Sequence, residues 1–340
     1  MASMDKSIKE IKKMNAAVLH AVGDLRFERV NIPKREKGEV LLKIFASGIC
    51  GSDIARIFTK GTYNFPTIPG HEFAGEIVES ENKNLIGRKA AVFPMLPCRN
   101  CGACEIGEYA QCENYDYYGS RRDGGFAEYI AVKEWNLVMI PDGLSYEEAA
   151  ICEPAAVALH AINQANIKLG DKVVIYGAGP IGMLLSQWAK INGAGLVKVA
   201  DIDPTKIEFA KKSGFGEYNG SFKADVVIEG SGASSALENC LKTAGNFGRV
   251  VLMGNPLGDM NISQKAYWEI LRKQLILAGT WNSSYNGMKN EWQISLDAMK
   301  SGSLNVKPLI THRFDLKNCN KAFEMMRDKK EFYSKVLFIV

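Results

Sequence analysis

The residues best suited to chemistry lie in two short stretches, Cys50-Gly51-Ser52-Asp53 and, further along the chain, Pro69-Gly70-His71-Glu72. They supply a thiol, an imidazole and a carboxylate, each beside a small or turn-forming residue. Zinc accepts this mixture of sulfur, nitrogen and oxygen ligands, and a catalytic zinc keeps one position open for water or substrate. The alternative is that His71 caps a turn, Glu72 is solvated and Cys50 is a small core residue, so these stretches alone leave the metal site open.

Four further cysteines, Cys98, Cys101, Cys104 and Cys112, are crowded into fifteen residues. The spacing Cys-x2-Cys-x2-Cys-x7-Cys lets four thiolates surround one tetrahedral zinc, and a site with all four positions closed is structural. An iron–sulfur cluster also suits four closely spaced cysteines. Eight cysteines in 340 residues are too sparse for a disulfide scaffold, so the group favours metal in a reducing compartment.

A nucleotide-binding pattern occupies residues 171–201. Residues 171–176 read as a strand, Gly177-Ala178-Gly179-Pro180-Ile181-Gly182 is a G-x-G-x-x-G turn, and a helix pattern follows. The next strand pattern ends at Asp201. Strand, glycine turn, helix and acid together form the complete dinucleotide fingerprint, in which the pyrophosphate rests on the helix N-terminus. Asp201 is expected to hold the ribose hydroxyls and to repel a 2′-phosphate, which favours NAD over NADP.

Two more places carry candidate site residues. Arg121 and Arg122 stand just before a glycine turn, and a pair of guanidinium forks suits a phosphate or carboxylate on a substrate. Two solvated arginines, or one paired with Asp123, fit the pattern as well. Glu153 begins a helix in an apolar segment, where a buried carboxylate needs a partner that zinc can supply. Cys152 is the competing ligand candidate.

The period of the apolar residues predicts two domains. Short strands with turns up to about residue 150 predict a compact, mostly β domain. Alternating strands and helices after it predict a parallel, doubly wound sheet. The apolar strand 335–340 must be covered, so we expect it to return to the first domain. The predicted division is a disordered tail at 1–13, a first domain at 14–155 and 288–340 with a zinc lobe near 95–115, and a dinucleotide-binding domain at 156–287.

Composition excludes several classes of protein. A hydrophobic share of 46% and a charged share of 24% are ordinary for a soluble globular protein. The net charge of +4 is small and no long basic run occurs, so nothing indicates a nucleic-acid partner. No apolar run has membrane-spanning length and no signal sequence is seen, so we expect no membrane contact and a cytoplasmic location.

Taken together, these motifs resemble the zinc-containing medium-chain dehydrogenase/reductase family over essentially the whole chain, in the family's order. The resemblance implies an α/β protein with a GroES-like, mostly β catalytic domain and a Rossmann NAD-binding domain. It also implies two zinc ions per chain, one catalytic and one structural, and a homodimer or homotetramer. The Cys-Gly-Ser-Asp form, Glu153 and Arg121-Arg122 look most similar to polyol and polyol-phosphate dehydrogenases. Within that subset, the stretch 119–130, with Ile57-Phe58 after Arg56 and with Gly279-Thr280-Trp281, carries the resemblance that implies oxidation of galactitol 1-phosphate to tagatose 6-phosphate.

The implied chemistry assigns roles to the candidate residues. Cys50, His71 and Glu153 would hold the catalytic zinc, with Glu72 as a near or exchanging ligand. Ser52 would take the proton from the zinc-bound hydroxyl before hydride leaves for the nicotinamide. Arg121 and Arg122 would anchor a distal phosphate of the substrate. Many relatives carry a histidine where this chain has Ala55, so the sequence does not reveal the route by which the proton leaves.

Two alternatives remain open at this stage. A dehydrogenase of an unphosphorylated substrate, of the sorbitol, butanediol or threonine type, needs no anion site. A non-catalytic zinc- and nucleotide-binding protein accounts for the four-cysteine lobe but has no use for the second set at Cys50 and His71. The sequence does not fix the oligomeric state, whether Glu72 is a permanent ligand, or the direction of flux.

Overall fold

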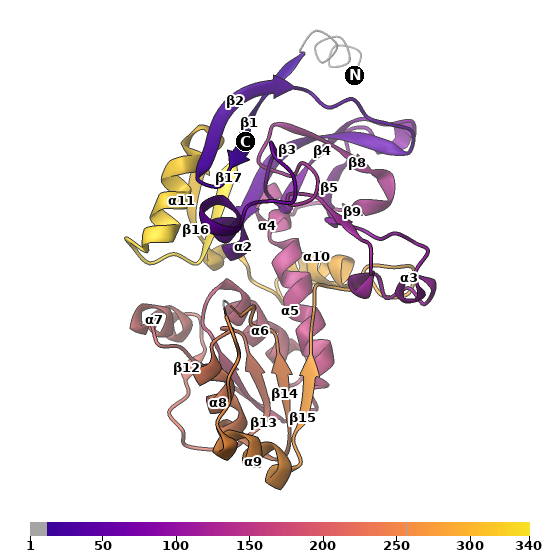
Figure 1. The fold of residues 1–340 in the computed structure, drawn as a ribbon. Coiled ribbons are helices and arrows are strands. Elements are labelled where there is room, and N and C mark those ends of the chain that lie inside the picture. The colour runs from indigo at the N-terminus through magenta and orange to yellow at the C-terminus, as the bar shows by residue number, and fades with distance from the viewer. Residues whose placement is uncertain (1–11, 257) are drawn as a thin grey trace. The chain divides into compact units, whose positions relative to one another are not determined.

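The computed structural model describes residues 12–256 and 258–340, which form two compact units (Figure 1). The first unit comprises the chain up to Glu153 together with Tyr285–Met288 and Ile310–Val340. The second unit comprises Pro154–Ser284 and Lys289–Leu309. The tail predicted for 1–13 lies outside the described residues up to residue 11. Its last residue, Lys13, begins a strand instead, because it pairs with Asn31 in an antiparallel hairpin.

A seven-stranded sheet frames the first unit, with the order β16-β17-β3-β4-β5-β9 and with β8 paired to β3. Every pair is antiparallel except β16 with β17. This sheet of mostly short strands confirms the predicted β domain. Its strands are β3 (Glu39–Ile49), β4 (Glu72–Glu79), β5 (Lys89–Val92), β8 (Tyr129–Lys133), β9 (Leu137–Met139), β16 (Ile310–Asp315) and β17 (Lys335–Ile339).

The final strand returns to the first unit, as expected, because β17 pairs with β3 and places Leu337 opposite Gly48. Other elements of this unit lie outside the sheet. They are β1 (Lys13–Ala21), β2 (Asp24–Asn31), α2 (Gly51–Ala55), which runs into a π-helix (Arg56–Lys60), β6 (Met95–Leu96), α3 (Gly102–Glu105), β7 (Asp116–Tyr117), α4 (Tyr146–Ala150) and α11 (Cys319–Asp328).

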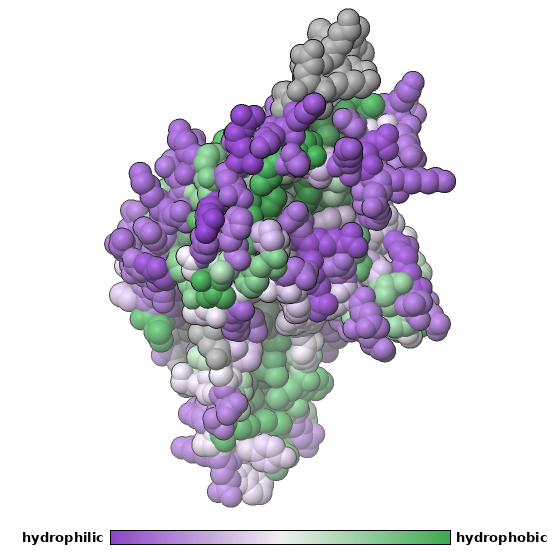
Figure 2. All heavy atoms as spheres, turned by 45° about the horizontal axis from the view of Figure 1, so that its top comes forward, coloured by the Kyte–Doolittle hydropathy of each residue, from purple (hydrophilic) through white to green (hydrophobic). Residues whose placement is uncertain are grey.

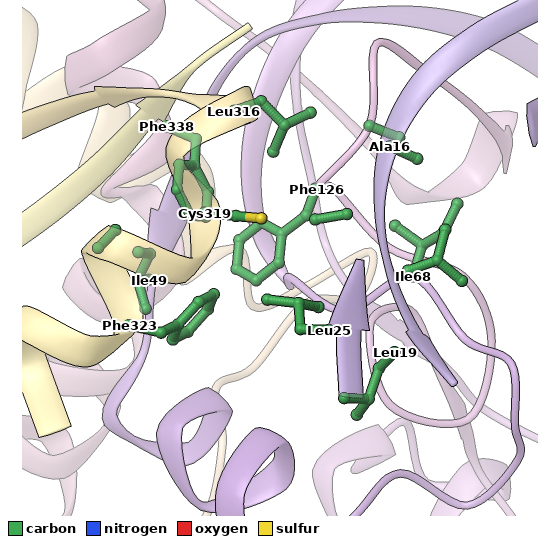
Figure 3. Packing of buried hydrophobic residues seen from close by; sticks show 14 of the residues in the cluster. Ala16, Leu19, Leu25, Ile49, Ile68, Phe126, Leu316, Cys319, Phe323 and Phe338 are labelled. Atoms are coloured by element: carbon green, nitrogen blue, oxygen red, sulfur yellow. The ribbon is translucent and has the colours of Figure 1, made fainter. Parts of the chain in front are cut away.

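An aromatic core joins distant parts of this unit (Figure 3). Phe126 packs edge-on against Phe323 of α11 and Phe338 of β17, with ring centroids 5.8 and 5.0 Å away. The ring of Phe126 also lies over Gly70, where a Cβ would come within 2.5 Å of it, and Gly70 has a φ of +98°. Glycine is therefore required at this turn, and the turn sets the position of His71 directly after it.

The second unit is a six-stranded parallel sheet with the order β12-β11-β10-β13-β14-β15. The order reverses between β10 and β13, which confirms the doubly wound Rossmann topology. None of the helices in the described chain is long and apolar enough to cross a membrane. The elements are α5 (Cys152–Ala165), β10 (Lys172–Tyr176), α6 (Pro180–Ile191), β11 (Leu196–Ala200), α7 (Pro204–Lys212), β12 (Gly216–Glu217), β13 (Ala224–Glu229), α8 (Ser234–Thr243), β14 (Ala244–Leu252), α9 (Gln264–Lys273), β15 (Ile276–Gly279) and α10 (Glu291–Ser301).

The predicted boundaries differ from the structure in three places, because residues 289–309 and 154–155 belong to the second unit and residues 285–287 belong to the first. Helix α10 buries Trp292 against the second unit. Its Glu291 carboxylate accepts a hydrogen bond from Asn163 at 2.8 Å and lies 3.1 Å from His160 Nδ1, both on α5. Contacts between residues distant in sequence decide this assignment. They also show that His160 is packed and hydrogen-bonded.

Candidate metal and nucleotide sites

The first candidate site lies where β3 ends and β4 begins. Because these two strands are antiparallel, with Gly48 opposite Glu72, the end of β3 brings Cys50 beside His71 and Glu72. One ligand atom from each of these three residues lies within 4.8 Å of the other two. The two sequence stretches that supply a thiol, an imidazole and a carboxylate are therefore brought together, as predicted.

The donor set fits a zinc ion. His71 and Glu72 are buried, and His71 Nδ1 has no hydrogen-bond partner among the described residues, although it lies 3.5 Å from Asp53 Oδ1. Burial alone would lower the pKa of His71, but the neighbouring Asp53 carboxylate raises it well above its ordinary value. Buried charged groups need compensation, and a cation bound by the thiolate, ring nitrogen and carboxylate would provide it.

Glu153, at the start of α5, lies outside this compact set of three but close to it. The carboxyl group is buried. Burial raises its pKa, and the negative charge of Glu72 raises it further, whereas a positive charge on His71 opposes the shift. Cys152, the competing candidate, is buried, and that burial raises its pKa well above the ordinary value, as expected of a core thiol. Glu153 thus interacts electrostatically with His71 and Glu72 of the three-residue set.

Ser52, the predicted proton acceptor, is held by a residue to which sequence reasoning gave no role. Arg56 Nη1 donates to Ser52 Oγ and to Asp53 Oδ1, both at 2.8 Å. The Asp53 carboxylate also accepts the Cys50 N–H at 3.0 Å. The spacing of four residues between Ser52 and Arg56 at a helix start is the signal that could have identified this contact.

Lys335 is a second residue that the sequence did not point to. Its Nζ donates to Glu72 Oε1 at 2.6 Å and to the Ile49 carbonyl at 3.1 Å, and it also contacts Glu72 Oε2. Burial alone would lower the pKa of Lys335, but the Glu72 and Cys50 charges raise it. The only sequence signal is a lysine at the head of an otherwise apolar strand, 263 residues away from its partner.

The two predicted substrate arginines have different partners. Arg122 contacts Asp116, and not Asp123, whose carboxylate instead accepts the Ile68 N–H at 2.8 Å. The Asp116 carboxylate hydrogen-bonded to Arg122 raises the pKa of this guanidinium. Half of the Arg122 side chain is exposed, with 51% of its surface accessible. Arg122 therefore has the features of a surface ion pair.

Arg121 lies between two aromatic rings. Its guanidinium carbon is 4.2 Å from the centroid of Tyr63 and 4.5 Å from that of Tyr115. Tyr115 packs against Tyr117, whose ring centroid is 5.9 Å from that of His71. A continuous row of aromatic rings thus connects Arg121 to the candidate metal site. Stacking covers the faces of the guanidinium and leaves its N–H edges for an anion.

The four cysteines of the lobe also come together. The Sγ atoms of Cys98 and Cys104 are 3.9 Å apart, and those of Cys101 and Cys112 are 4.0 Å apart. A zinc–sulfur bond of about 2.3 Å gives tetrahedral sulfur–sulfur edges of about 3.8 Å. An iron–sulfur cluster places several atoms between its cysteines and needs wider spacing, so this arrangement fits one zinc ion. Backbone N–H groups of Glu113 and Cys104 lower the pKa of Cys101 to about 6, which favours the thiolate.

The glycine turn of the second unit has the geometry that a pyrophosphate site requires. It joins β10 to α6, with Pro180 at the first position of the helix. Gly177 has a φ of +108°, and a Cβ on Gly182 would lie 1.8 Å from the Gly177 carbonyl oxygen. Asp201 follows β11 and accepts the Ala178 N–H at 2.8 Å. These residues form a compact group at the carboxyl ends of the central strands.

Lys206 is an additional residue at this nucleotide site. Its Nζ lies 3.9 Å from Asp201 Oδ2, with Asp201 almost completely buried. The contact arises because α7 begins shortly after Asp201, a short-range signal that sequence reasoning passed over. Its ammonium group adds a hydrogen-bond donor beside the acid expected to bind the ribose.

Two family models match the chain. The model described as alcohol dehydrogenase GroES-like domain matches residues 36–142, and the model described as zinc-binding dehydrogenase matches residues 180–301. The first covers β3 through β9 and both candidate metal sites except Glu153. The second covers α6 through α10. The first model thus covers strands of the mostly antiparallel sheet, and the second covers strands of the parallel sheet.

Curated proteins and a solved structure agree with these matches. The chain is 36% identical to galactitol 1-phosphate 5-dehydrogenase of Escherichia coli strain K12 over 320 residues, 88% of this chain and 92% of that protein. It is 30% identical to sorbitol dehydrogenase of Bacillus subtilis strain 168 over 350 residues, 96% of this chain and 97% of that protein. The crystal structure of galactitol-1-phosphate dehydrogenase from Escherichia coli matches with a TM-score of 0.89 and 34% identity, covering 96% of this chain and 100% of that chain.

Proposed function

Because the chain belongs to the family of zinc-containing medium-chain alcohol and polyol dehydrogenases, we propose that it oxidises a polyol phosphate with NAD, specifically galactitol 1-phosphate to tagatose 6-phosphate. The set of Cys50 with the buried His71 and Glu72, with Ser52 held beside it, is the observation that carries the dehydrogenase chemistry. The likeness to the Escherichia coli enzyme over most of both chains supports the choice of substrate.

Residues of the first unit have different roles in the proposed reaction. Cys50, His71 and Glu153 would hold the catalytic zinc, with Glu72 as a near ligand, and the ion would lower the pKa of the substrate hydroxyl. Ser52 would accept the proton that the substrate hydroxyl loses. Because Arg56 donates to Ser52 Oγ, the serine keeps its own hydrogen free for the next acceptor, and the guanidinium stabilises negative charge that develops on the oxygen.

Arg121 is the proposed anchor for the substrate phosphate. Its stacked guanidinium is held between Tyr63 and Tyr115, and the row of aromatic rings connects it to His71. Arg122 is the weaker candidate of the predicted pair, because Asp116 already neutralises its charge. A fixed guanidinium binds phosphate with little loss of side-chain freedom, which favours affinity.

The other unit supplies the cofactor site in this proposal. Gly177, Gly179, Pro180, Ile181 and Gly182 would receive the pyrophosphate of NAD, and Asp201 would bind the adenosine ribose. Cys98, Cys101, Cys104 and Cys112 would bind the second, structural zinc. We place the protein in a reducing compartment, the cytoplasm, because its cysteines are free thiols suited to metal.

The test is NAD reduction by the zinc-loaded protein with galactitol 1-phosphate, galactitol, sorbitol and threonine at equal concentration. Turnover confined to the phosphorylated polyol supports the proposal. Turnover with a plain polyol would favour the second candidate, a dehydrogenase of the sorbitol type. The 30% identity to sorbitol dehydrogenase over 96% of this chain is the observation behind that alternative.

We also propose that two copies associate through the edge of the second sheet. Strand β15 is the last strand of that sheet, with Ile276 61% and Leu277 39% exposed. Figure 2 shows hydrophobic side chains at the surface of the second unit. Strand β15 and helix α9 contribute the exposed residues Tyr267, Trp268, Leu271, Ile276 and Leu277. An apolar, unpaired edge strand is suited to pairing with the same strand of a second copy.

A further inference from the structure

Two neighbouring tyrosines in the first unit have opposite surroundings. Tyr118 is 3% exposed and its hydroxyl accepts the Lys133 N–H at 3.1 Å, so it is a core residue with a satisfied polar group. Tyr117 is only half-buried, and none of the described residues forms a hydrogen bond with its hydroxyl. A tyrosine hydroxyl that is removed from bulk water usually has a hydrogen-bond partner. The partner of the Tyr117 hydroxyl therefore has to be water or a bound molecule.

The ring of Tyr117 lies beside the candidate metal site and is held there by its neighbours. Its centroid is 5.9 Å from that of His71 and 6.2 Å from that of Tyr115, the ring that stacks on Arg121. The Tyr117 carbonyl accepts the N–H groups of Arg121 and Arg122 at 3.0 and 3.1 Å. Tyr117 is thus the member of the aromatic row next to His71, between the candidate metal site and the proposed phosphate anchor.

The charges that act on Tyr117 belong to the candidate reaction site. Burial raises the pKa of Tyr117 well above its ordinary value, and the negative charge of Glu153 raises it further, whereas the positive charge of Arg56 opposes the shift. A negative charge on Cys50 also raises this pKa. The hydroxyl therefore keeps its hydrogen and can donate a hydrogen bond. Because Cys50 belongs to the metal donor set and Arg56 holds Ser52, the Tyr117 hydroxyl is close to the groups that would act on the substrate hydroxyl.

We propose that Tyr117 is a specificity-determining residue, whose hydroxyl donates a hydrogen bond to the substrate hydroxyl next to the carbinol that is oxidised. In a polyol every carbinol has such a neighbour, whereas in a monohydric alcohol none does. A monohydric alcohol would displace water from the site and leave the Tyr117 hydroxyl without a partner, and an unsatisfied polar group is costly. Sites that hydrogen-bond a substrate hydroxyl reject analogues that lack it for this reason. The inference rests on the proposed dehydrogenase reaction but does not depend on the substrate phosphate.

The first experiment compares 2,3-butanediol with 2-butanol, which has the same carbon skeleton but lacks the neighbouring hydroxyl. In the unaltered enzyme, kcat/KM for NAD reduction should be higher with the diol. Tyr117→Phe removes only the hydroxyl and should lower the ratio of the two kcat/KM values by roughly 5- to 100-fold. Tyr118→Phe, the matched control, should leave this ratio unchanged but lower the unfolding temperature, because the Lys133 N–H loses its acceptor. A ratio that falls equally in both variants, or in neither, would overturn the proposal.

A binding measurement decides the case in which neither alcohol is oxidised. Hydrogen bonding changes the ultraviolet absorption of tyrosine, so zinc-loaded protein without NAD should give a larger tyrosine difference spectrum with 2,3-butanediol than with 2-butanol. The diol signal should be absent in Tyr117→Phe and present in Tyr118→Phe. The same signal in Tyr117→Phe as in the unaltered protein, or no signal from the unaltered protein, would refute the inference. Since this measurement needs no turnover, failure to oxidise galactitol 1-phosphate refutes the proposed substrate alone.

Discussion

Two neighbouring arginines offer a direct test of the phosphate site, because the structure gives them different surroundings. Arg121 is stacked between Tyr63 and Tyr115, whereas Arg122 contacts Asp116 and is half exposed. Replacing each with alanine removes a positive charge at almost the same place in the chain. Arg122→Ala is thus a matched control for Arg121→Ala.

The expected magnitudes follow from these contacts. A hydrogen bond to a charged group contributes about 1.5–3 kcal/mol, which corresponds to roughly 10- to 100-fold in a rate or binding constant. Arg121→Ala should therefore lower kcat/KM for galactitol 1-phosphate by that factor, through KM, and leave any slow turnover of galactitol unchanged. A surface ion pair contributes about 0–1 kcal/mol, so Arg122→Ala should change kcat/KM by less than about fivefold with either substrate.

The assay is the initial rate of NAD reduction with each substrate, together with inhibition by inorganic phosphate. Arg121→Ala should weaken phosphate inhibition, and Arg121→Lys should restore part of the affinity, since lysine keeps the charge but loses the planar fork. Equal losses in the two alanine variants would refute the reasoning. So would an equal loss of activity with galactitol 1-phosphate and galactitol in Arg121→Ala.

Four further predictions address other parts of the chain. Arg56→Ala should lower kcat by about tenfold or more with phosphorylated and plain polyols alike, because the variant loses the hydrogen bond to Ser52, and KM should change little. Arg56→Lys should recover part of the lost kcat. Cys101→Ser should reduce the zinc content by one ion per chain, measured by atomic absorption, and lower the unfolding temperature. Asp201→Ala should raise kcat/KM with NADP relative to NAD by roughly tenfold, since a negative charge beside the 2′-phosphate is removed. Ile276→Glu should convert the proposed dimer to monomer in light scattering, whereas Leu169→Glu, at an even more exposed position away from the sheet edge, should not.

The parts of the site that the sequence predicted are those formed by residues close together in the chain. The spacing of Cys98 to Cys112 limits how far apart the four thiols can be, and the structure brings them within tetrahedral distance. The turn after β10 needs glycine at Gly177 and Gly182 for steric reasons that any such turn shares. Local geometry of this kind can be deduced without knowing the rest of the fold.

The parts that the sequence did not predict depend on contacts between distant residues. Lys335 contacts Glu72 only because β17 returns to pair with β3. Residues 289–309 join the second unit because Glu291 meets His160 and Asn163 on α5, which no pattern near Glu291 indicates. Apolar periodicity predicts that one face of an element packs against another element, but it does not identify that other element. The domain to which such a segment belongs therefore has to come from the three-dimensional structure.

The position of Arg56 also limits how a proton can leave the site. Ala55 has no group that can carry a proton, and one residue later Arg56 donates to Ser52 Oγ. A guanidinium stays protonated across the working pH range, so Arg56 cannot relay a proton as an imidazole does. Its effect on the reaction must therefore be electrostatic, through stabilisation of negative charge on Ser52. In the proposed reaction, Ser52 then passes its own hydroxyl hydrogen to water or to the bound cofactor. The pH dependence of kcat should be the same in Arg56→Lys as in the unaltered enzyme, because both side chains stay charged across the working pH range. A new inflection near the pKa of histidine in Arg56→His, accompanied by recovery of kcat above that of Arg56→Ala, would show that a titrating group at this position can join the proton path.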